Sequence, residues 1–277
     1  MEGTMNKQIK RLEEKSNQIR KEILDVVYNA KAGHIGGAMS STDILTTLYY
    51  HIMNISPENA KDSNRDRFIL SKGHIAEALY CILADKGFFS RDKLKTYSQF
   101  NSTLIGHPNK KNEGIEVNTG SLGHGLSLAV GMAIAGKRDK KSYRVFTLMG
   151  DGELAEGSIW EGAMAASHYK LDNLVAIIDR NKLQISGTTE EVMTLENLQE
   201  KWQSFGWKVV QVDGNNITEL VEVFDKIPLK KNKPTMIIAN TIKGKGISFM
   251  ENNVKWHHGV LTEEQYIKAV EDLKEGK

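Results

Sequence analysis

Hydrophobic residues follow two spacings along this chain, one typical of amphipathic helices and the other of buried strands. A recurrence every three or four residues predicts a helix over residues 6–31, through Ile9, Leu12, Ile19, Ile23 and Val27. Short uninterrupted apolar runs predict buried strands at 68–70, 144–149, 174–179, 208–212 and 235–239. Helical patterns between these runs predict a helix that starts at Ser40 or Ser41 and further helices over 76–86, 126–137, 157–170 and 218–226.

The order of the predicted elements indicates how they assemble. Strands that alternate with helices favour an α/β fold, with a doubly wound, mostly parallel sheet and helices on both faces. The 277 residues suffice for one large domain of this kind, and no repeat or low-complexity linker divides them. We therefore expect a single domain over residues 1–277.

Composition and charge narrow the function classes. The net charge of +2 and the scattered lysines give no basic face for nucleic acid. No apolar run is long enough to span a bilayer, and the polar residues 1–18 do not look like a secretory signal. The single cysteine, Cys81, cannot form an internal disulfide and lies in an apolar helical pattern. It is expected to pack in the core of a cytoplasmic protein.

The most informative polar residues follow two of the predicted strands. Gly150-Asp151-Gly152 ends one apolar run, and Asn181 follows the next. In an open parallel sheet, both strand ends lie at the carboxyl edge, where such folds bind ligands. A carboxylate and a carboxamide supply hard oxygen ligands suited to Mg²⁺ on a diphosphate, and the glycines let backbone N–H groups approach phosphate. Gly-Asp-Gly alone is a common turn sequence. A cofactor site is favoured because a second strand ends at Asn181 with matching spacing.

Four loops place histidine beside glycine. They contain His34, His74, His107 and the adjacent pair His257 and His258. A single histidine of this kind is usually a hydrogen-bonded loop residue. The spacing is not that of a metal site, because no HxxxH helix and no cysteine partners are present. Four such loops instead predict neutral donors and proton shuttles around one cleft.

In combination, these motifs closely resemble those of the transketolases, specifically the N-terminal half that binds the diphosphate of thiamine diphosphate. The resemblance covers residues 10–262 in the family's order, through GHIGGAMSSTDIL, RDRFILSKGH, IGHP, TGSLGHGLSLAVGMA, GDGELAEGSIWEGA, DRNKLQISG and IKGKGIS with WHHG. The family's pyrimidine-binding and C-terminal domains have no counterpart in this sequence. The resemblance therefore implies one subunit of a split transketolase.

The resemblance also implies roles for individual residues. Mg²⁺, or else Ca²⁺ or Mn²⁺, would be held by the side chains of Asp151 and Asn181 and the main-chain carbonyl of Leu183. Thiamine diphosphate would be bound by His74, Gly120, Leu122, Gly150, Asp151, Gly152, Glu153, Asn181 and His258. The catalytic residues would be His34, His74, His107 and His258, of which His34 and His107 would reach the hydroxyls of the donor sugar. Glu156 and Glu161 would lie at a dimer contact, or else at a solvated helix N-terminus, where negative charge is favoured.

The implied reaction is a ketol transfer of carbohydrate metabolism, as in the pentose phosphate pathway. A two-carbon unit would pass from a ketose phosphate to an aldose acceptor, with thiamine diphosphate as its carrier. The glutamate that activates the cofactor belongs to the family's pyrimidine-binding domain, so this chain would need a separate C-terminal subunit. Two copies of each subunit would form a heterotetramer.

Some positions depart from the family pattern. Ser121 and His124 replace a proline and a glutamine that many transketolases have beside the cofactor. The donor could therefore be an unusual sugar phosphate or a sulfosugar. The adjacent His257 and His258 leave open which one faces the cofactor, and His258 is chosen because it precedes Gly259.

Two other functions remain as alternatives. The α subunit of a 2-oxo acid dehydrogenase would use the same cofactor, but such subunits typically lack loops like those around His74 and His107. A non-catalytic subunit that binds a phosphosugar or a nucleotide would not need Asp151, Asn181 and the histidines together. The segment Lys243-Gly-Lys-Gly lacks the spacing of a P-loop and is predicted to be a mobile loop over the diphosphate.

Overall fold

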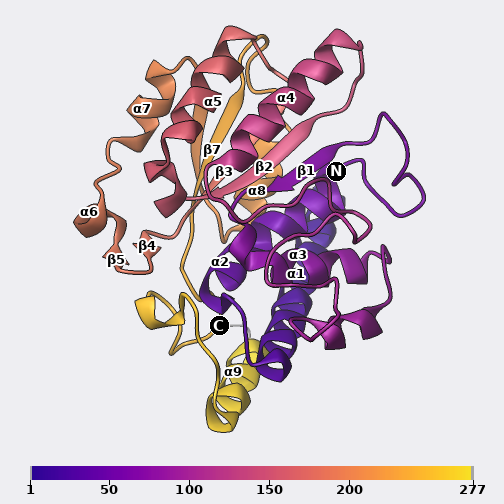
Figure 1. Ribbon diagram of the computed structural model, residues 1–277, viewed down its shortest axis with the longest axis vertical. Helices are drawn as coiled ribbons and strands as arrows, with labels where there is room; N and C mark the ends of the chain where they lie inside the picture. Colours follow the sequence, from indigo (N-terminus) through magenta and orange to yellow (C-terminus); the bar gives the residue numbers. More distant parts are fainter. Residues whose placement is uncertain (1, 276–277) are drawn as a thin grey trace.

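A five-stranded parallel sheet lies at the centre of the computed structural model, which describes residues 2–275. In spatial order its strands are β1 (Arg67–Leu70), β2 (Val145–Gly150), β3 (Leu174–Arg180), β7 (Thr235–Asn240) and β6 (Lys208–Asp213) (Figure 1). Every neighbouring pair in this sheet runs parallel. The predicted strands are thus confirmed, and their ends differ from the prediction by single residues.

Helices cover both faces of the sheet, and the strand side chains alternate between two cores. The core on one face is formed with α1 (Glu2–Ala30), α2 (Ile35–Thr47), α3 (Ala76–Asp85), α8 (Ile217–Phe224) and α9 (Glu263–Glu275), of which α9 packs against α1. The other face packs against α4 (His124–Arg138), α5 (Gly157–His168) and α7 (Leu198–Ser204). In β2, Phe146 and Leu148 belong to the first core, and Val145 and Met149 to the second. The doubly wound α/β fold is confirmed.

Helix α2 begins earlier than the sequence pattern predicts, at Ile35 rather than at Ser40 or Ser41. Glycine in a helix costs about 1 kcal/mol relative to alanine, so the glycines at 36 and 37 favour a loop. Packing outweighs this cost, because a Cβ at Gly36 would lie only 2.5 Å from the carbonyl oxygen of Trp256. The helix can therefore approach the segment around Trp256 only with glycine at this position.

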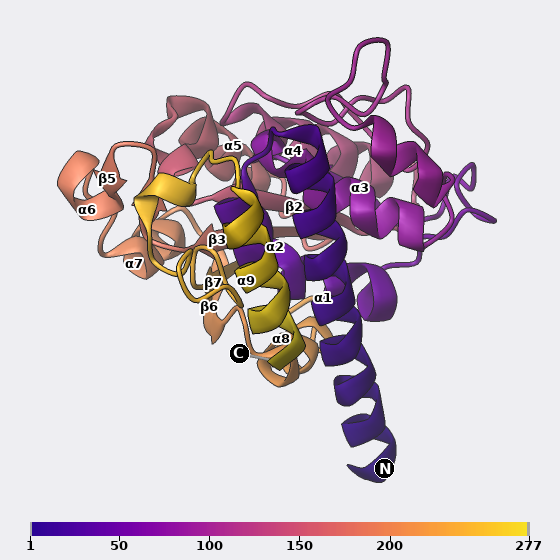
Figure 2. The ribbon, with the colours of Figure 1, turned by 90° about the horizontal axis from the view of Figure 1, so that it is seen from below.

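Helix α9 is not predicted by the sequence pattern, because few of its residues are apolar. It lies beside α1 in the structure (Figure 2). The Asn17 side chain donates a hydrogen bond to the carbonyl oxygen of Leu273 at 2.9 Å, and the Tyr28 and Tyr266 rings stack with their centroids 4.2 Å apart. Contacts between distant parts of the chain thus determine this helix. Within residues 2–275, no helix is both long and apolar enough to cross a membrane.

A short antiparallel hairpin follows β3 at the carboxyl edge of the sheet. It consists of β4 (Leu183–Gln184) and β5 (Gly187–Thr188), and α6 (Thr189–Val192) continues the chain (Figure 1). The hairpin approaches the loop after β2 closely, since a Cβ at Gly152 would lie 2.8 Å from the Oε1 of Gln184. A side chain at position 152 would therefore displace the end of the Gln184 side chain.

Candidate functional site

A cavity of about 370 Å³ opens at the carboxyl edge of the sheet. It lies where β2 and β3 end in register, with Gly150 opposite Asp179. Its wall contains most of the predicted site residues, namely His34, His74, Gly120, Leu122, Gly150, Asp151, Gly152, Glu153, Asn181 and Leu183. The wall is completed by Lys72, Gln184, Ile185, Ser186, Lys243 and His257. Motifs that are far apart in the sequence therefore meet around one space.

Asp151 lies at this edge with only 2% of its surface exposed. Its Oδ1 accepts a hydrogen bond from the Gly152 N–H at 2.8 Å. Its Oδ2 accepts from the Lys182 N–H at 2.6 Å and from the Arg180 guanidinium at 3.2 Å. Burial is the main cause that raises the pKa of Asp151, and the nearby Asp179 carboxylate raises it further. A cation in the cavity would stabilise this carboxylate, because it offsets the cost of burying a negative charge.

Asn181 and Leu183 bring two further oxygens to the edge. The Asn181 Nδ2 donates to the Oδ2 of Asp179 at 3.1 Å, and its Oδ1 accepts from the Leu183 N–H at 3.2 Å. The Leu183 carbonyl oxygen accepts a hydrogen bond from the Lys243 ammonium at 3.1 Å, so a positive charge already lies against this oxygen. Burial, with a smaller contribution from the charge of Lys72, lowers the pKa of Lys243 to about 8.

The chemistry of these donors fits a hard divalent cation. Between residues 2 and 275, no group of three or more histidine, cysteine, aspartate or glutamate side chains could hold a metal ion. A metal at the carboxyl edge would therefore have at most two ligands of these kinds, and carbonyl, phosphate and water oxygens would complete its shell. Asp151, Asn181 and the Leu183 carbonyl suit such a shell, and their role as ligands stays a prediction.

Glu153 has both carboxylate oxygens bound by the chain itself. Its Oε1 accepts from the Gly123 N–H at 2.8 Å and from the Ser71 hydroxyl, and its Oε2 accepts from the Gly150 N–H at 3.0 Å. Burial raises the pKa of Glu153, and these hydrogen bonds oppose the shift. A carboxylate would also repel a diphosphate. Glu153 thus holds the loops around the cavity, and its predicted contact with the cofactor stays a prediction.

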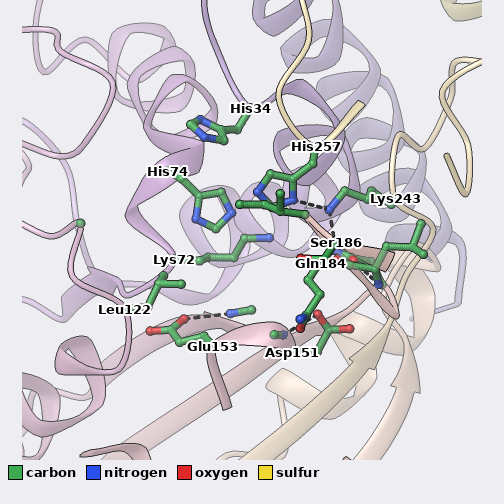
Figure 3. Close-up of a pocket in the computed structure, with 16 residues that line it drawn as sticks. His34, Lys72, His74, Leu122, Asp151, Glu153, Gln184, Ser186, Lys243 and His257 are labelled. Atoms are coloured by element: carbon green, nitrogen blue, oxygen red, sulfur yellow. Dashed lines mark hydrogen bonds between the residues drawn. The ribbon is translucent and has the colours of Figure 1, made fainter. Parts of the chain in front are cut away.

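Three histidines line the side of the cavity opposite Asp151, and the Lys72 side chain lies between them and this carboxylate (Figure 3). The ring centroid of His34 lies 5.2 Å from that of His74 and 5.7 Å from that of His257. Burial lowers the pKa of His34 to about 4 and that of His257 to about 3, and it also holds the pKa of His74 well below the usual range. At pH 7 these rings are neutral, so each can donate one hydrogen bond and accept another.

The structure places His257, and not the predicted His258, in the cavity wall. His257 directly follows a 3₁₀ turn that ends at the buried Trp256. His258 is exposed, although its ring centroid lies 4.8 Å from that of His34. The buried Trp256 thus precedes the histidine that enters the wall, and the cofactor contact predicted for His258 stays a prediction.

His107 lies beside the cavity wall rather than in it. Its ring centroid is 6.4 Å from that of His34. A Cβ at Gly120, which has a φ of +156°, would lie 3.2 Å from the Cδ2 of His107. Burial lowers the pKa of His107. The structure thus brings His107 close to His34 and to the predicted cofactor loop at Gly120.

A buried ion pair under the cavity was not predicted from the sequence. The side chains of Lys72 and Asp179 are 2% and 0% exposed and bind each other directly. Asp179 also accepts hydrogen bonds from the hydroxyl of Ser40 at 2.7 Å and from the Asn181 Nδ2. Burial alone would raise the pKa of Asp179, but the Lys72 ammonium and the hydrogen bonds hold it below its usual range. The Ser-Lys-Gly-His motif points to Lys72, but its partner comes from β3 and is visible only in the fold.

Glu77 on α3 is another buried carboxylate that the sequence did not predict. It lies next to the loop of His34. Its surface is 0% exposed. Its Oε1 accepts from the His34 N–H at 2.6 Å, and its Oε2 accepts from the Tyr97 hydroxyl at 3.2 Å. Burial raises the pKa of Glu77 from the usual 4.5 to about 7, although these hydrogen bonds favour the charged form.

The raised pKa makes stability depend on pH through Glu77. Below pH 4.5 the carboxyl group is protonated in both the folded and the unfolded state, so its contribution to the free energy of unfolding is fully present. Between pH 4.5 and about 7 only the unfolded state ionises, so this contribution is lost as the pH rises through about 7. A shift of this size corresponds to about 3 kcal/mol. Glu77→Gln should remove this loss. We expect the melting temperature of the variant, relative to the native chain, to rise by about 5 °C or more between pH 5 and pH 8.

Glu156→Gln is the matched control, since Glu156 is exposed. Its melting temperature relative to the native chain should stay constant over the same pH range, as measured by circular dichroism. A constant difference for Glu77→Gln would contradict the assignment of a titrating Glu77.

Comparison with known proteins extends these observations. A family model described as the transketolase, thiamine diphosphate binding domain matches residues 12–274. A chain from Phocaeicola vulgatus that is named as one subunit of an apulose-4-phosphate transketolase is 54% identical over 268 residues, which cover 97% of this chain and 95% of that protein. A 6-deoxy-6-sulfo-D-fructose transketolase subunit from Clostridium sp. is 44% identical and covers 96% of this chain and 97% of its own.

Longer proteins match only in part. The crystal structure of transketolase from Campylobacter jejuni superposes with a TM-score of 0.89 at 33% identity, over 96% of this chain and 43% of that chain. Human transketolase is 39% identical over 95% of this chain and 42% of its own length. This chain therefore spans about two fifths of the length of these two proteins.

Proposed function

The chain belongs to the transketolase family, and from this membership we propose that it is the diphosphate-binding subunit of a split transketolase. Two relatives that are named as subunits match it along 95% and 97% of their own lengths. The observation that carries the proposal is the convergence of Asp151, Asn181 and three neutral histidines on one cavity at the carboxyl edge. Membership of this family leaves no support for the α subunit of a 2-oxo acid dehydrogenase.

Thiamine diphosphate and Mg²⁺ are the proposed occupants of the cavity. The Asp151 carboxylate, the Asn181 carboxamide oxygen and the Leu183 carbonyl would hold the metal ion. The ammonium groups of Lys72 and Lys243 line the same cavity and would balance the charge of the diphosphate. When bound, the cofactor supplies a nucleophilic carbon that carries the two-carbon unit.

The histidines would bind the donor sugar and move its protons. The Nδ1 of His34 is buried and has no hydrogen-bond partner among the residues that the structure describes. Because the ring is neutral at pH 7, it can accept a proton from a sugar hydroxyl or donate to a developing alkoxide. His107, whose ring lies near that of His34, would contact the same substrate.

We propose a partner subunit that carries the pyrimidine-binding domain, in a heterotetramer with two copies of each chain. Two relatives are named as single subunits of apulose-4-phosphate transketolases, which supports a partner of this kind. The described surface offers apolar side chains for such a contact, including Leu128 on α4 and Met164 on α5, which are 41% and 56% exposed. Glu156 and Glu161 are exposed on the same part of the surface, at and within α5.

The donor is proposed to be a ketose phosphate, with apulose 4-phosphate as the first to test. The relative named for this sugar shares 54% of its residues with this chain, whereas the human transketolase shares 39%. The relative named for 6-deoxy-6-sulfo-D-fructose makes a sulfosugar the second candidate. Ser121 and His124, both exposed beside the cavity loop, are the positions at which the sequence departs from many transketolases.

The split-enzyme proposal predicts that this chain has no activity alone. The purified chain with thiamine diphosphate and Mg²⁺ should not transfer a ketol unit, because the partner subunit would supply the pyrimidine-binding domain. Addition of the pyrimidine-domain subunit from the same organism should restore transfer from at least one of three donors: apulose 4-phosphate, 6-deoxy-6-sulfofructose and xylulose 5-phosphate. The measurement is aldose-dependent product formation with glyceraldehyde 3-phosphate as the acceptor.

Two outcomes would contradict this proposal. Substantial turnover by the chain alone would exclude the need for a partner. A reconstituted pair that binds thiamine diphosphate but transfers no ketol unit from any of the three donors would exclude the proposed activity. The partner chain by itself is the control.

A further inference from the structure

We propose that helix α3 sets the spacing of the two sugar-facing loops that carry His34 and His107. On this helix, Glu77 binds the loop of His34 and Tyr80 binds the loop of His107. The spacing would control which donor hydroxyls fit. The inference rests on the proposed function, because it takes His34 and His107 to contact the donor sugar. Glu77 and Tyr80 would act as positioning residues, since neither lines the cavity itself.

Glu77 binds the backbone of the first loop. The 2.6 Å hydrogen bond from the His34 N–H to its Oε1 holds the residue immediately before α2. The approach depends on Gly33, which has a φ of +150°. A Cβ there would lie 3.2 Å from the Glu77 Oε1 and 2.6 Å from the Cγ2 of Val27. Position 33 therefore has no room for a side chain between α1 and Glu77, and the hydrogen bond to the Glu77 carboxyl group holds the loop against α3.

Tyr80 binds the backbone of the second loop. Its hydroxyl donates a hydrogen bond to the carbonyl oxygen of His107 at 2.7 Å, and its side chain is 0% exposed. The ring packs edge-on against that of Tyr97, with the centroids 6.1 Å apart. Tyr97 in turn donates to the Oε2 of Glu77. The two contacts are thus joined by a third buried side chain.

The helix can act as a rigid spacer between the loops. Residues three apart in a helix lie on the same face, so Glu77 and Tyr80 are neighbours. The helix itself is held in the core by Leu79, Ile82 and Leu83, each less than 4% exposed. The result is the 6.4 Å separation between the ring centroids of His34 and His107. A displacement of about 1 Å at such a site can reduce catalytic efficiency by about a hundredfold.

A simple structural role for Glu77 is the competing explanation. A buried carboxylate is costly, and a neutral side chain would fill the same space with less loss of stability. The two donors that it binds are the His34 backbone and a tyrosine that contacts Tyr80. Both connect it to the histidine loops, which favours positioning over stability.

The test uses the enzyme assembled from both subunits, with variants of Glu77 and Tyr80. Donors are the best of the three sugars named above and hydroxypyruvate, which supplies the same two-carbon unit with loss of CO₂ and has no hydroxyl beyond that unit. Glu77→Ala should lower kcat/KM for the sugar by about tenfold or more, mainly through KM, but for hydroxypyruvate by less than about threefold. Tyr80→Phe should lower kcat/KM for the sugar by about threefold to tenfold.

Two controls separate positioning from general damage. Glu77→Gln keeps an oxygen for the His34 N–H and should restore the sugar kcat/KM to within about threefold of the native value. Cys81→Ala changes a fully buried residue on the same helix, where the cysteine packs in the core as expected, and should leave the preference between donors unchanged. Thiamine diphosphate affinity, measured by calorimetry, should be the same in all of these variants.

The inference is overturned if Glu77→Ala affects both donors equally, if Glu77→Gln is as impaired as Glu77→Ala, or if Tyr80→Phe and Glu77→Ala both leave the sugar kinetics unchanged. If Glu77→Ala does not fold, the comparison of Glu77→Gln with Tyr80→Phe tests the inference. Only Tyr80→Phe should then have a lower kcat/KM for the sugar. A native enzyme that uses no ketose donor would instead contradict the proposed function.

Discussion

Replacing Asp151 by alanine should lower the affinity of the assembled enzyme for thiamine diphosphate, in the presence of Mg²⁺, by about two to three orders of magnitude. Asp151 is the one charged side chain among the three residues proposed to hold the metal, and it is 2% exposed. The other ligands, Asn181 and the Leu183 carbonyl, are neutral. Removing one partner of a buried charged contact costs about 3–5 kcal/mol, and each 1.4 kcal/mol changes affinity about tenfold. Calorimetric titrations at increasing Mg²⁺ would measure the loss.

The fold should tolerate this substitution. Arg180, which binds Asp151, also donates to Glu190 at 3.0 Å and to Glu196 at 2.9 Å, so its charge stays compensated. Glu190→Gln is the matched control, because it removes a different partner of Arg180 that does not line the cavity. It should leave the Mg²⁺ dependence unchanged. Native affinity in Asp151→Ala would refute the metal assignment.

Lys72→Met should destabilise the chain by about 3–5 kcal/mol, which lowers the melting temperature by about 10 °C. The methionine fills similar space but leaves the carboxylate of Asp179 buried without its ion-pair partner. The hydroxyl of Ser40 and the amide of Asn181 remain as donors to Asp179, but neither carries a charge. Urea unfolding followed by circular dichroism would give the loss of free energy.

Two further variants test the origin of this loss. Lys137→Met breaks the partly exposed ion pair with Asp172 and should cost less than about 1 kcal/mol. The double variant Lys72→Met with Asp179→Asn should recover part of the stability, because no unpaired buried charge remains. Equal losses for Lys72→Met and Lys137→Met would contradict a buried-charge effect.

Much of the fold follows from local patterns in the sequence. The strands β2, β3 and β7 are short runs of mostly aliphatic and small residues without polar alternation, because both faces of the sheet are covered. Helices with a clear apolar stripe, such as α1, are equally visible. The start of α2 and the existence of α9 were missed because packing against distant segments, around Trp256 and along α1, outweighs weak local preference.

The site could be predicted wherever a motif carries its own chemistry. Gly150-Asp151-Gly152 and Asn181 end two strands that are neighbours in the sheet, so their convergence follows from the strand order. The direction of a side chain in an irregular loop does not follow from such a rule. The sequence therefore could not show that His257 lines the cavity wall, or that backbone N–H groups bind the carboxylate of Glu153. The cofactor contacts predicted for His258 and Glu153 stay predictions.

The sequence by itself determined the α/β class, the strands and the loops that carry the polar residues, because hydrophobic spacing and glycine positions act over a few neighbouring residues. Only the tertiary structure decided which charged groups are paired beneath the cavity and which helix holds the histidine loops. Lys72 with Asp179, and Glu77 with His34, are separated by 107 and 43 residues. Contacts over such distances depend on how whole helices and strands pack, and no local pattern in the chain records them.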